Sequence, residues 1–396
     1  MLRKILNFIY IFLGLLLVSH YFRYSLWDTT SGPKLILVYI VFTYLYVIFK
    51  INIVRKSYDS NYKIVIWLLL SGSVTVLVSL ASNLGSVDSQ RDIVLVLSVI
   101  PVYFFLKARN ISQKEIINAF TIYLLITVII QVYQQINFSN PLFGLEWTDN
   151  GEAFTGYQRN DLFRFNIGIA VLGEFCLFYF WSRICEHRSL FSISFFIISA
   201  VSVYLYLTRQ YMVASLLSVL ISLFMIKDKK IKRWGFIGIL MFSAVLVINY
   251  DIFFKELIEY SESDTYSTDI RKVAFGFIFS HVFDNPIMWL TGHGHTYDEI
   301  LWTRKGLYTN DVGFVGQMYI MGIVWVIVYF YTVYKFIWKK RKELPLYLKL
   351  FVFCTLVHSP MVFPYQDLSS SFIWMVFLYL CSLEEKKFYY EKQHKS

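Results

Sequence analysis

The chain alternates between long apolar runs and short polar connections along almost its whole length. A helix that crosses a bilayer needs roughly 20 mostly apolar residues, and twelve segments approach that pattern. They cover residues 5–22, 33–50, 64–81, 93–106, 116–136, 162–181, 190–207, 211–226, 234–254, 312–334, 346–363 and 369–383. The pattern predicts an all-α, polytopic integral membrane protein with about 12 transmembrane helices, in which residues 1–396 form a single transmembrane domain.

Composition narrows the class of protein further. Hydrophobic residues make up 57% of the 396 residues and charged residues only 16%, with a mean hydropathy of +0.53. An ordinary soluble domain carries about 25% charged residues. These values exclude a soluble globular enzyme, a disordered chain and a nucleic-acid-binding domain. The first apolar run lacks a small-residue cleavage site after it, so we expect a retained span rather than a signal peptide.

The distribution of charge predicts the topology. If the N-terminus lies inside, most of the 37 lysine and arginine residues fall in inner connections, and every inner connection is net positive. The outer connections are mainly acidic. This asymmetry is typical of membrane proteins with a positive inner side, and it predicts that both termini are cytoplasmic. The net charge of +10 is therefore assigned to topology and not to a nucleic-acid partner.

Two outer loops carry most of the polar length. Residues 137–161 form a smaller external loop and residues 255–311 a large one, whereas all inner connections are short. Long loops of this kind are usually functional, so chemistry is expected at the outer face of the membrane. Within the large loop, Thr268-Asp269 followed by apolar residues at helical spacing predicts an amphipathic helix that rests on the outer leaflet or on the bundle.

A few arginines stand on the otherwise acidic outer side, and they are the main candidates for ligand binding. They are Arg91, Arg159, Arg164, Arg209 and Arg271. Arg209 lies in the only polar break between two apolar runs, where a charge is costly and usually faces a polar cavity. The alternative is a turn residue that snorkels to the interface. Arg164 is either a ligand-binding residue or an interfacial anchor paired with Asp161.

Arg271 and Lys272 occupy the expected first turn of the loop helix. A cation there opposes the helix dipole, and its presence makes better sense if an anion such as a phosphate docks at that N-terminus. Asp269 offers the alternative, because it satisfies the dipole by itself. Arginine suits a diphosphate through bidentate, permanently charged contacts.

The segment Thr291-Gly292-His293-Gly294-His295 contains two histidines in a glycine-rich setting. Three interpretations remain open: a tight turn with exposed imidazoles, a loop in which one histidine accepts a proton, and a metal site completed by Asp298 or Glu299. A lone His-x-His is weak support for a metal. We therefore expect no metal and no cofactor.

Other candidates lie in or near the predicted spans. Glu174 is an intramembrane carboxylate, so it is a functional candidate or a hydrogen-bonded packing residue beside Gly173. The four cysteines fall in or beside apolar runs, which argues against a disulfide framework and against paired metal ligands. Aromatic residues of the outer loops serve either as sugar-stacking platforms or as an interfacial belt.

Three stretches of the chain, taken in order, resemble a known family. They are Leu207-Thr208-Arg209-Gln210 opening a span; Asp269-Ile270-Arg271 followed by Phe283-Asp-Asn-Pro286 and Thr291-Gly-His-Gly294; and Asn310-Asp311-Val-Gly313-Phe-Val-Gly316 followed by Met321-Gly322. Together with the topology, they resemble the O-antigen polymerase (Wzy) and O-antigen ligase superfamily of bacterial polysaccharide enzymes. The resemblance covers roughly residues 155–335.

The resemblance implies a fold similar to the GT-C class and a metal-independent, inverting glycosyltransferase on the outer face of the bacterial cytoplasmic membrane. The substrate would be an undecaprenyl-diphosphate-linked oligosaccharide used for O-antigen, capsule or exopolysaccharide. A chain-length regulator and a flippase of the same pathway are the implied partners. Arg209, Arg164, Arg271 and Arg159 would then bind the diphosphate.

The place where ligases of this family carry a His-Asn pair reads Asn310-Asp311 here, which favours a polymerase over a ligase. The departure leaves the catalytic base open among Asp311, His293 and His295. A flippase or transporter of lipid-linked oligosaccharides is the alternative from another class, and a scaffold in an export complex is a third.

Overall fold

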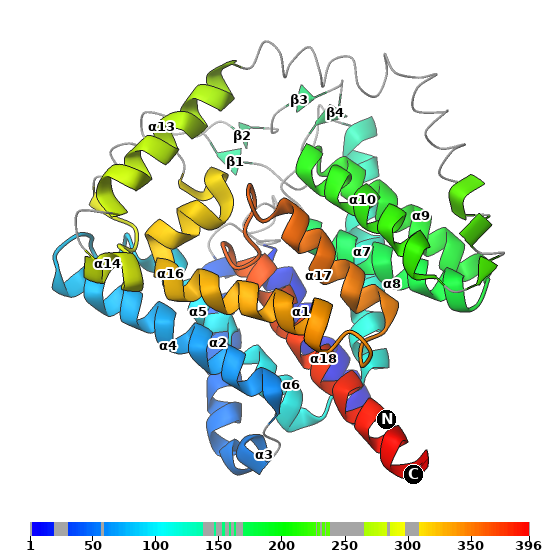
Figure 1. The fold of residues 1–396 in the computed structure, drawn as a ribbon. Helices are drawn as coiled ribbons and strands as arrows, with labels where there is room; N and C mark the ends of the chain where they lie inside the picture. Colours follow the sequence, from blue (N-terminus) through cyan, green and yellow to red (C-terminus); the bar gives the residue numbers. More distant parts are fainter. Residues whose placement is uncertain are drawn as a thin grey trace. The chain divides into compact units, whose positions relative to one another are not determined.

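The computed structural model describes residues 2–19, 31–56, 59–137, 146–147, 153–154, 158–159, 162–163, 169–226, 228–229, 232–233, 235–237, 265–282, 286–297 and 309–395. This part of the chain is predominantly helical, as the hydrophobic pattern predicts (Figure 1). Residues 146–163 contribute the described strands, which form two short antiparallel pairs.

The N-terminal half contains the helices α1 (Leu2–Val18), α2 (Ser31–Phe49), α3 (Ile51–Lys56), α4 (Ser60–Ala81), α5 (Arg91–Val99), α6 (Val102–Arg109), α7 (Gln113–Ile136) and α8 (Ala170–Glu186). The strands β1 (Glu146–Trp147), β2 (Ala153–Phe154), β3 (Gln158–Arg159) and β4 (Leu162–Phe163) lie between α7 and α8.

The remaining elements are α9 (Leu190–Leu205), α10 (Arg209–Met225), α13 (Thr265–Val282), α14 (Pro286–Thr291), the 3₁₀ turn η2 (Thr309–Val312), α16 (Gly313–Tyr334), the π-helix η3 (Lys335–Lys339), α17 (Leu346–His358) and α18 (Leu368–Lys395).

Among the described residues, three helices are long and apolar enough to cross a membrane: Asn61–Ala81, Gln113–Ile136 and Gly313–Lys339. Four shorter apolar helices, Lys34–Phe49, Leu190–Leu205, Gln210–Met225 and Leu346–His358, coincide with other expected spans. These helices agree with a membrane protein. The number of twelve spans stays a prediction, since most of the segment expected at 234–254 lies outside the described residues.

Two expected spans differ from the pattern. The segment 93–106 is interrupted between α5 and α6 at Pro101, which cannot donate a backbone hydrogen bond to the preceding turn. The segment expected from residue 162 begins as a helix only at Ala170, because Leu162 and Phe163 belong to a strand that pairs with β3. Apolar side chains at a loop exit had extended the apparent span at its N-terminal end.

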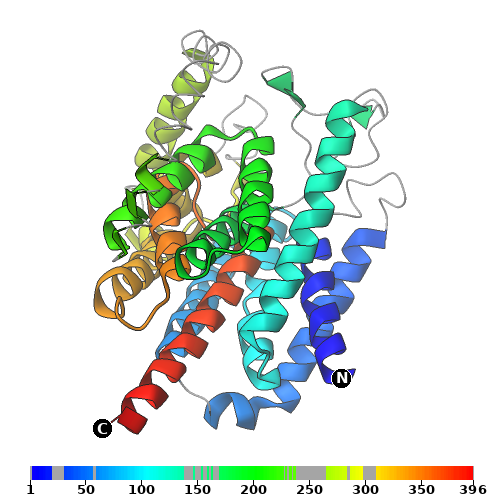
Figure 2. The ribbon, with the colours of Figure 1, turned by 90° about the vertical axis from the view of Figure 1, so that its right-hand side faces the viewer.

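The chain divides into two compact units. Unit 1 contains Met1–Ile36, Lys114–Thr265 and Pro345–Cys354; unit 2 contains Leu37–Gln113, Tyr266–Leu344 and Thr355–Ser396. In unit 1, α8 packs along α9, and α10 lies beside both (Figures 1 and 2). Its core includes Phe175, whose ring meets those of Phe120, Tyr347 and Phe351 edge to face at 5.3–5.6 Å between centroids.

Unit 2 is built around α4, α16 and α18. Helix α4 runs beside α16, and α18 packs against α4, α5 and α6 (Figure 1). Tyr329 of α16 and Trp374 of α18 are almost fully buried and meet edge to face, with their ring centroids 5.8 Å apart. Burial of such large side chains is a major source of stability, and it fixes α16, which carries the candidate site.

Candidate functional site

The helix α16 is broken within its apolar stretch. Gly322 has φ 80° and ψ 166°, so the helix consists of two halves, residues 313–321 and residues 323–334. Following the predicted topology, we call them the outer half and the inner half. Non-helical backbone at membrane depth is tolerated where it is buried in protein or lines a polar cavity. The break in α16 therefore needs neighbouring groups that form hydrogen bonds with the backbone it exposes.

The segment 291–296, which we call the glycine–histidine segment, fills the break. Gly292 has φ 84° and lies directly against Gly322. A Cβ atom on Gly322 would stand 2.3 Å from the carbonyl oxygen of Leu290, and one on Gly292 would stand 2.3 Å from that of Ile320. Both positions need glycine, for conformation and for space.

Backbone hydrogen bonds join the glycine–histidine segment to the outer half of α16. His293 N donates to Tyr319 O at 2.8 Å, and Gly294 N donates to Ile320 O at 2.9 Å. The buried Thr75 hydroxyl of α4 bonds to the carbonyl of Thr291 and lies 3.2 Å from that of Met321. Polar groups freed by the break thus acquire partners from a neighbouring helix, as a membrane interior requires.

The imidazole of His293 is held by Tyr319. The two rings stack at 4.6 Å between centroids with an interplanar angle of 12°, and only 6% of His293 is exposed. The hydroxyl of Tyr319 lies 3.1 Å from the Thr296 hydroxyl, so Tyr319 contacts the segment at two points. The expectation of a turn with exposed imidazoles is wrong for His293, because stacking and backbone pairing draw it into the bundle.

His295 is held through its backbone and keeps a half-buried side chain. The amide of Gln90 donates to His295 O at 2.7 Å and accepts from His295 N at 3.2 Å. Gly294, with φ 67°, leaves room for this amide, because a Cβ there would stand 2.3 Å from Gln90 Oε1. Gln90 and Tyr319 were not expected from the sequence, because Gln90 is one of several polar residues in the stretch 86–92 and Tyr319 is one of many aromatic residues in an apolar run.

The amphipathic loop helix is present as α13, and it begins at Thr265, three residues earlier than expected. Arg271 and Lys272 are therefore in the second turn, not the first, so the expectation of a first-turn cation is wrong and the dipole gives no argument for a phosphate beside them. Arg271 is half-buried and shares a helix face with the buried Ala274 and Ile278. Phe277 contacts Tyr319 edge to face, with 5.5 Å between ring centroids, and so packs α13 on the outer half of α16.

The other predicted site residues lie in other elements or outside the described residues. Arg209 is the first residue of α10, and Arg159 lies in β3 opposite Leu162; their side chains, like the whole of Arg164, lie outside the described residues. The backbone of Asp311 is in η2, directly before α16, and its side chain is likewise outside the description. Asp298 and Glu299 are outside it as well.

The two units divide the predicted site. Arg159, Arg164 and Arg209 belong to unit 1, whereas Arg271, His293, His295 and Asp311 belong to unit 2. Within unit 2, the structure brings His293 and α13 together on Tyr319. Convergence of the arginines on one cavity stays a prediction.

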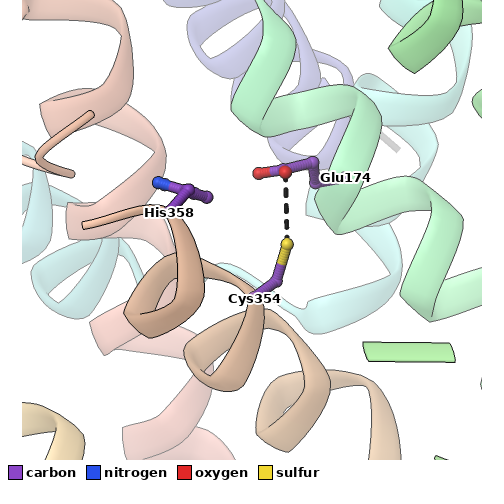
Figure 3. Close-up of side chains that lie close together, drawn as sticks. All are labelled: Glu174, Cys354 and His358. Carbon is purple, nitrogen blue, oxygen red and sulfur yellow. Dashed lines mark hydrogen bonds between the residues drawn. The ribbon is translucent and has the colours of Figure 1, made fainter. Parts of the chain in front are cut away.

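Glu174 is fully buried in unit 1 and bonded to neighbouring helices. Cys354 Sγ of α17 donates to Glu174 Oε1 at 3.1 Å (Figure 3). Ser215 Oγ of α10 lies 3.4 Å from the same oxygen. A Cβ on the adjacent Gly173 would stand 3.1 Å from Ser202 Oγ of α9. These contacts favour the packing interpretation of Glu174.

A comparison with models of protein families finds no match, and no curated protein matches the sequence. The resemblance to the O-antigen polymerase and ligase superfamily therefore rests on the residues and their order alone.

Proposed function

We propose that the protein is a surface-polysaccharide polymerase that transfers lipid-diphosphate-linked oligosaccharide repeat units at the outer face of the cytoplasmic membrane. One observation carries this proposal: the glycine–histidine segment is fixed into the break of α16, where His293 and the Arg271-bearing helix α13 share Tyr319. A rigid histidine-containing segment beside an arginine-bearing helix suits transfer from an anionic donor.

The proposed reaction is an inverting transfer. The acceptor sugar hydroxyl gives its proton to a base, and its oxygen forms the new bond to the anomeric carbon of the donor. The bond from that carbon to the diphosphate oxygen breaks, and undecaprenyl diphosphate leaves with the electron pair. Arg209, Arg164, Arg271 and Arg159 bind the diphosphate and stabilise its departure, so the transfer needs no metal.

His295 is the base that the geometry favours among the three candidates. Its side chain is half-buried and so keeps access to solvent. Two hydrogen bonds with Gln90 hold its backbone in place. Histidine is the side chain most often used as a general base. His293 is packed on Tyr319 and serves to position the segment. Asp311 remains the alternative base.

The test uses purified protein and a synthetic lipid-diphosphate oligosaccharide in detergent. We expect wild-type protein to lengthen the oligosaccharide, and His295→Gln to lose about 100-fold or more in rate, as is usual when a general base is removed. His187→Gln, at an exposed histidine beyond α8, is the matched control and should keep full activity. Absence of elongation by wild-type protein, or full activity of both His295→Gln and Arg271→Ala, contradicts the proposal.

One observation favours a second candidate function, a transporter or flippase of lipid-linked oligosaccharides. Transporters often place their binding sites at discontinuous helices, and both α16 and the α5–α6 pair are discontinuous. Movement of the lipid-linked oligosaccharide across a vesicle membrane without elongation is the result that distinguishes this function from the polymerase.

A further inference from the structure

The inner end of α16 continues into a π-helix that aligns two lysines. The backbone bond from Lys340 N to Lys335 O, at 2.7 Å, spans five residues. In an α-helix, side chains five residues apart point about 140° away from each other. The wider π turn brings Lys335 and Lys340 towards one face. Such turns are rare in proteins, and those that occur often lie at functional sites.

This face pairs with α18. Glu385 and Tyr389 are four residues apart, so they share one side of that helix. Lys335 Nζ lies 3.5 Å from Glu385 Oε1, and Lys340 Nζ donates to the Tyr389 hydroxyl at 2.8 Å. The first pair is buried, with side chains 3% and 6% exposed. Lys335 also donates to Asn61 of α4, so the inner ends of three helices are joined.

The pairing gathers uncompensated positive charge. Lys340 is neutralised by Glu343, at 2.8 Å, and Lys335 by Glu385. Six exposed basic residues stand around these pairs, and we call them the inner platform: Lys339, Arg341, Lys342, Lys386, Lys387 and Lys392. Within the described part of the chain, none of the six forms an ion pair.

An exposed aromatic pair precedes the basic residues on the side of the apolar helix. Trp338 is 65% exposed and stacks on Tyr334, with 6.2 Å between ring centroids. Aromatic rings of this kind settle at the level of lipid headgroups. Lys339 ends the span Gly313–Lys339, and Arg341 and Lys342 directly follow it, so in the predicted topology these three residues stand at headgroup height.

We propose that the inner platform binds anionic phospholipid headgroups of the leaflet that it faces, which is the cytoplasmic leaflet in the predicted topology. Clusters of four to eight basic residues next to a membrane span attract anionic lipids strongly. Lysine and arginine donors match phosphate oxygens. Positive charge on the inner side sets topology in general, but here a π-helix and two side-chain pairs also tie together the two segments that carry the six charges.

Lipid retention by purified protein tests this proposal. The protein is mixed with equimolar phosphatidylglycerol and phosphatidylcholine in neutral detergent micelles, and bound lipids are counted by native mass spectrometry. We expect wild-type protein to retain phosphatidylglycerol preferentially, with the preference falling as salt is raised. The triple variant Lys386→Gln, Lys387→Gln, Lys392→Gln should lose about tenfold of that preference.

The matched control removes three exposed, inner-side basic residues outside the platform: Lys63→Gln, Lys114→Gln and Arg188→Gln. It lowers the net charge equally and should keep the preference. Equal loss in both triple variants, or no preference in wild-type protein, overturns the proposal. Tyr389→Phe keeps every charge but removes the Lys340 bond, so it should weaken the preference partially. The measurement involves no transfer reaction, so its outcome is independent of the proposed polymerase activity.

Discussion

At the scale of single residues, Gly322 and Gly292 have little freedom to vary. Each has a positive φ, and each backbone lies against the other with no space for a side chain. Met321-Gly322 in the sequence reads as part of a continuous apolar span. The break depends on a contact with residues 290–292, which no local pattern encodes.

Replacing Gly322 by alanine tests the close contact between the backbones of Gly322 and Gly292. Its backbone conformation is essentially restricted to glycine, which costs about 1–3 kcal/mol for another residue, and the clash with Leu290 O adds to this. We expect a clearly lower melting temperature in detergent. Gly276→Ala is the matched control, because nothing lies within 4 Å of a Cβ there and the site is an exposed helix; it should be neutral or slightly stabilising. Similar melting temperatures of the two variants would contradict the close contact between Gly322 and Gly292.

Asp59 is a second residue on which several elements depend. Its carboxylate caps α4 by accepting from Asn61 N and Tyr62 N at 3.0 Å, and it accepts from Tyr103 at 2.7 Å and from Lys107 at 2.8 Å. Burial by itself raises the pKa of the Asp59 carboxyl, but the bond and charge of Lys107, helped by Tyr103, outweigh burial and hold the pKa below its ordinary value.

The sign of this shift fixes the pH dependence of stability. Because the folded-state pKa is lowered, the contribution of Asp59 is present above the unfolded value, about 3.9, and is lost as pH falls through the folded value. Asp59→Asn leaves Lys107, whose side chain is 2% exposed, without its charge partner, at a cost of about 3–5 kcal/mol. Thermal melts at pH 7 should show the loss, and exposed Asp92→Asn should not. A loss that is as large below pH 3 as at pH 7 would contradict this assignment.

At the scale of elements, most helices could be predicted because apolar length alone specifies them. The existence of α13 was also predictable from its cap and apolar spacing, although its start at Thr265 was not. The role of Tyr319 could not be predicted from the sequence. It is one of many aromatics in an apolar run, and only the tertiary fold places it between Phe277 and His293.

The docking of α13 depends on one face of the helix. Phe277 is 6% exposed against Tyr319, whereas Phe275 is 36% exposed on the other side. Phe277→Ala should lose an aromatic contact worth about 0.5–1.5 kcal/mol beyond its buried area. Hydrogen exchange of the α13 amides should then accelerate, with α4 and α18 unchanged. Phe275→Ala is the matched control and should leave exchange as in wild-type protein. The reverse order of the two variants would show that α13 docks by its other face.

At the scale of the whole molecule, the charge pattern predicts which end faces the cytoplasm, and the proposed chemistry depends on this sidedness. The glycine–histidine segment and α13 belong to the end predicted to be outside, and the inner platform to the other end. The hydrophobic pattern could predict apolar helices, since apolar length is a property of local composition, whereas the sidedness stays a prediction from charge. It could not predict whether arginines of unit 1 and unit 2 meet, because that depends on packing between distant segments.

Single cysteines test the sidedness directly. In a Cys185→Ser background, where the other three native cysteines are buried, a cysteine at exposed Lys272 of α13 should react with a membrane-impermeant thiol reagent in intact spheroplasts. Cysteines at exposed Arg188 and Lys387 should react only after permeabilisation. The physical reason is that basic connections are retained on the inner side during insertion. Because Lys272 and Lys387 both lie in unit 2, opposite labelling of the two also tests whether that unit crosses the membrane. Labelling of Lys387→Cys in intact spheroplasts would place the platform outside, and with it remove the outer location proposed for glycosyl transfer.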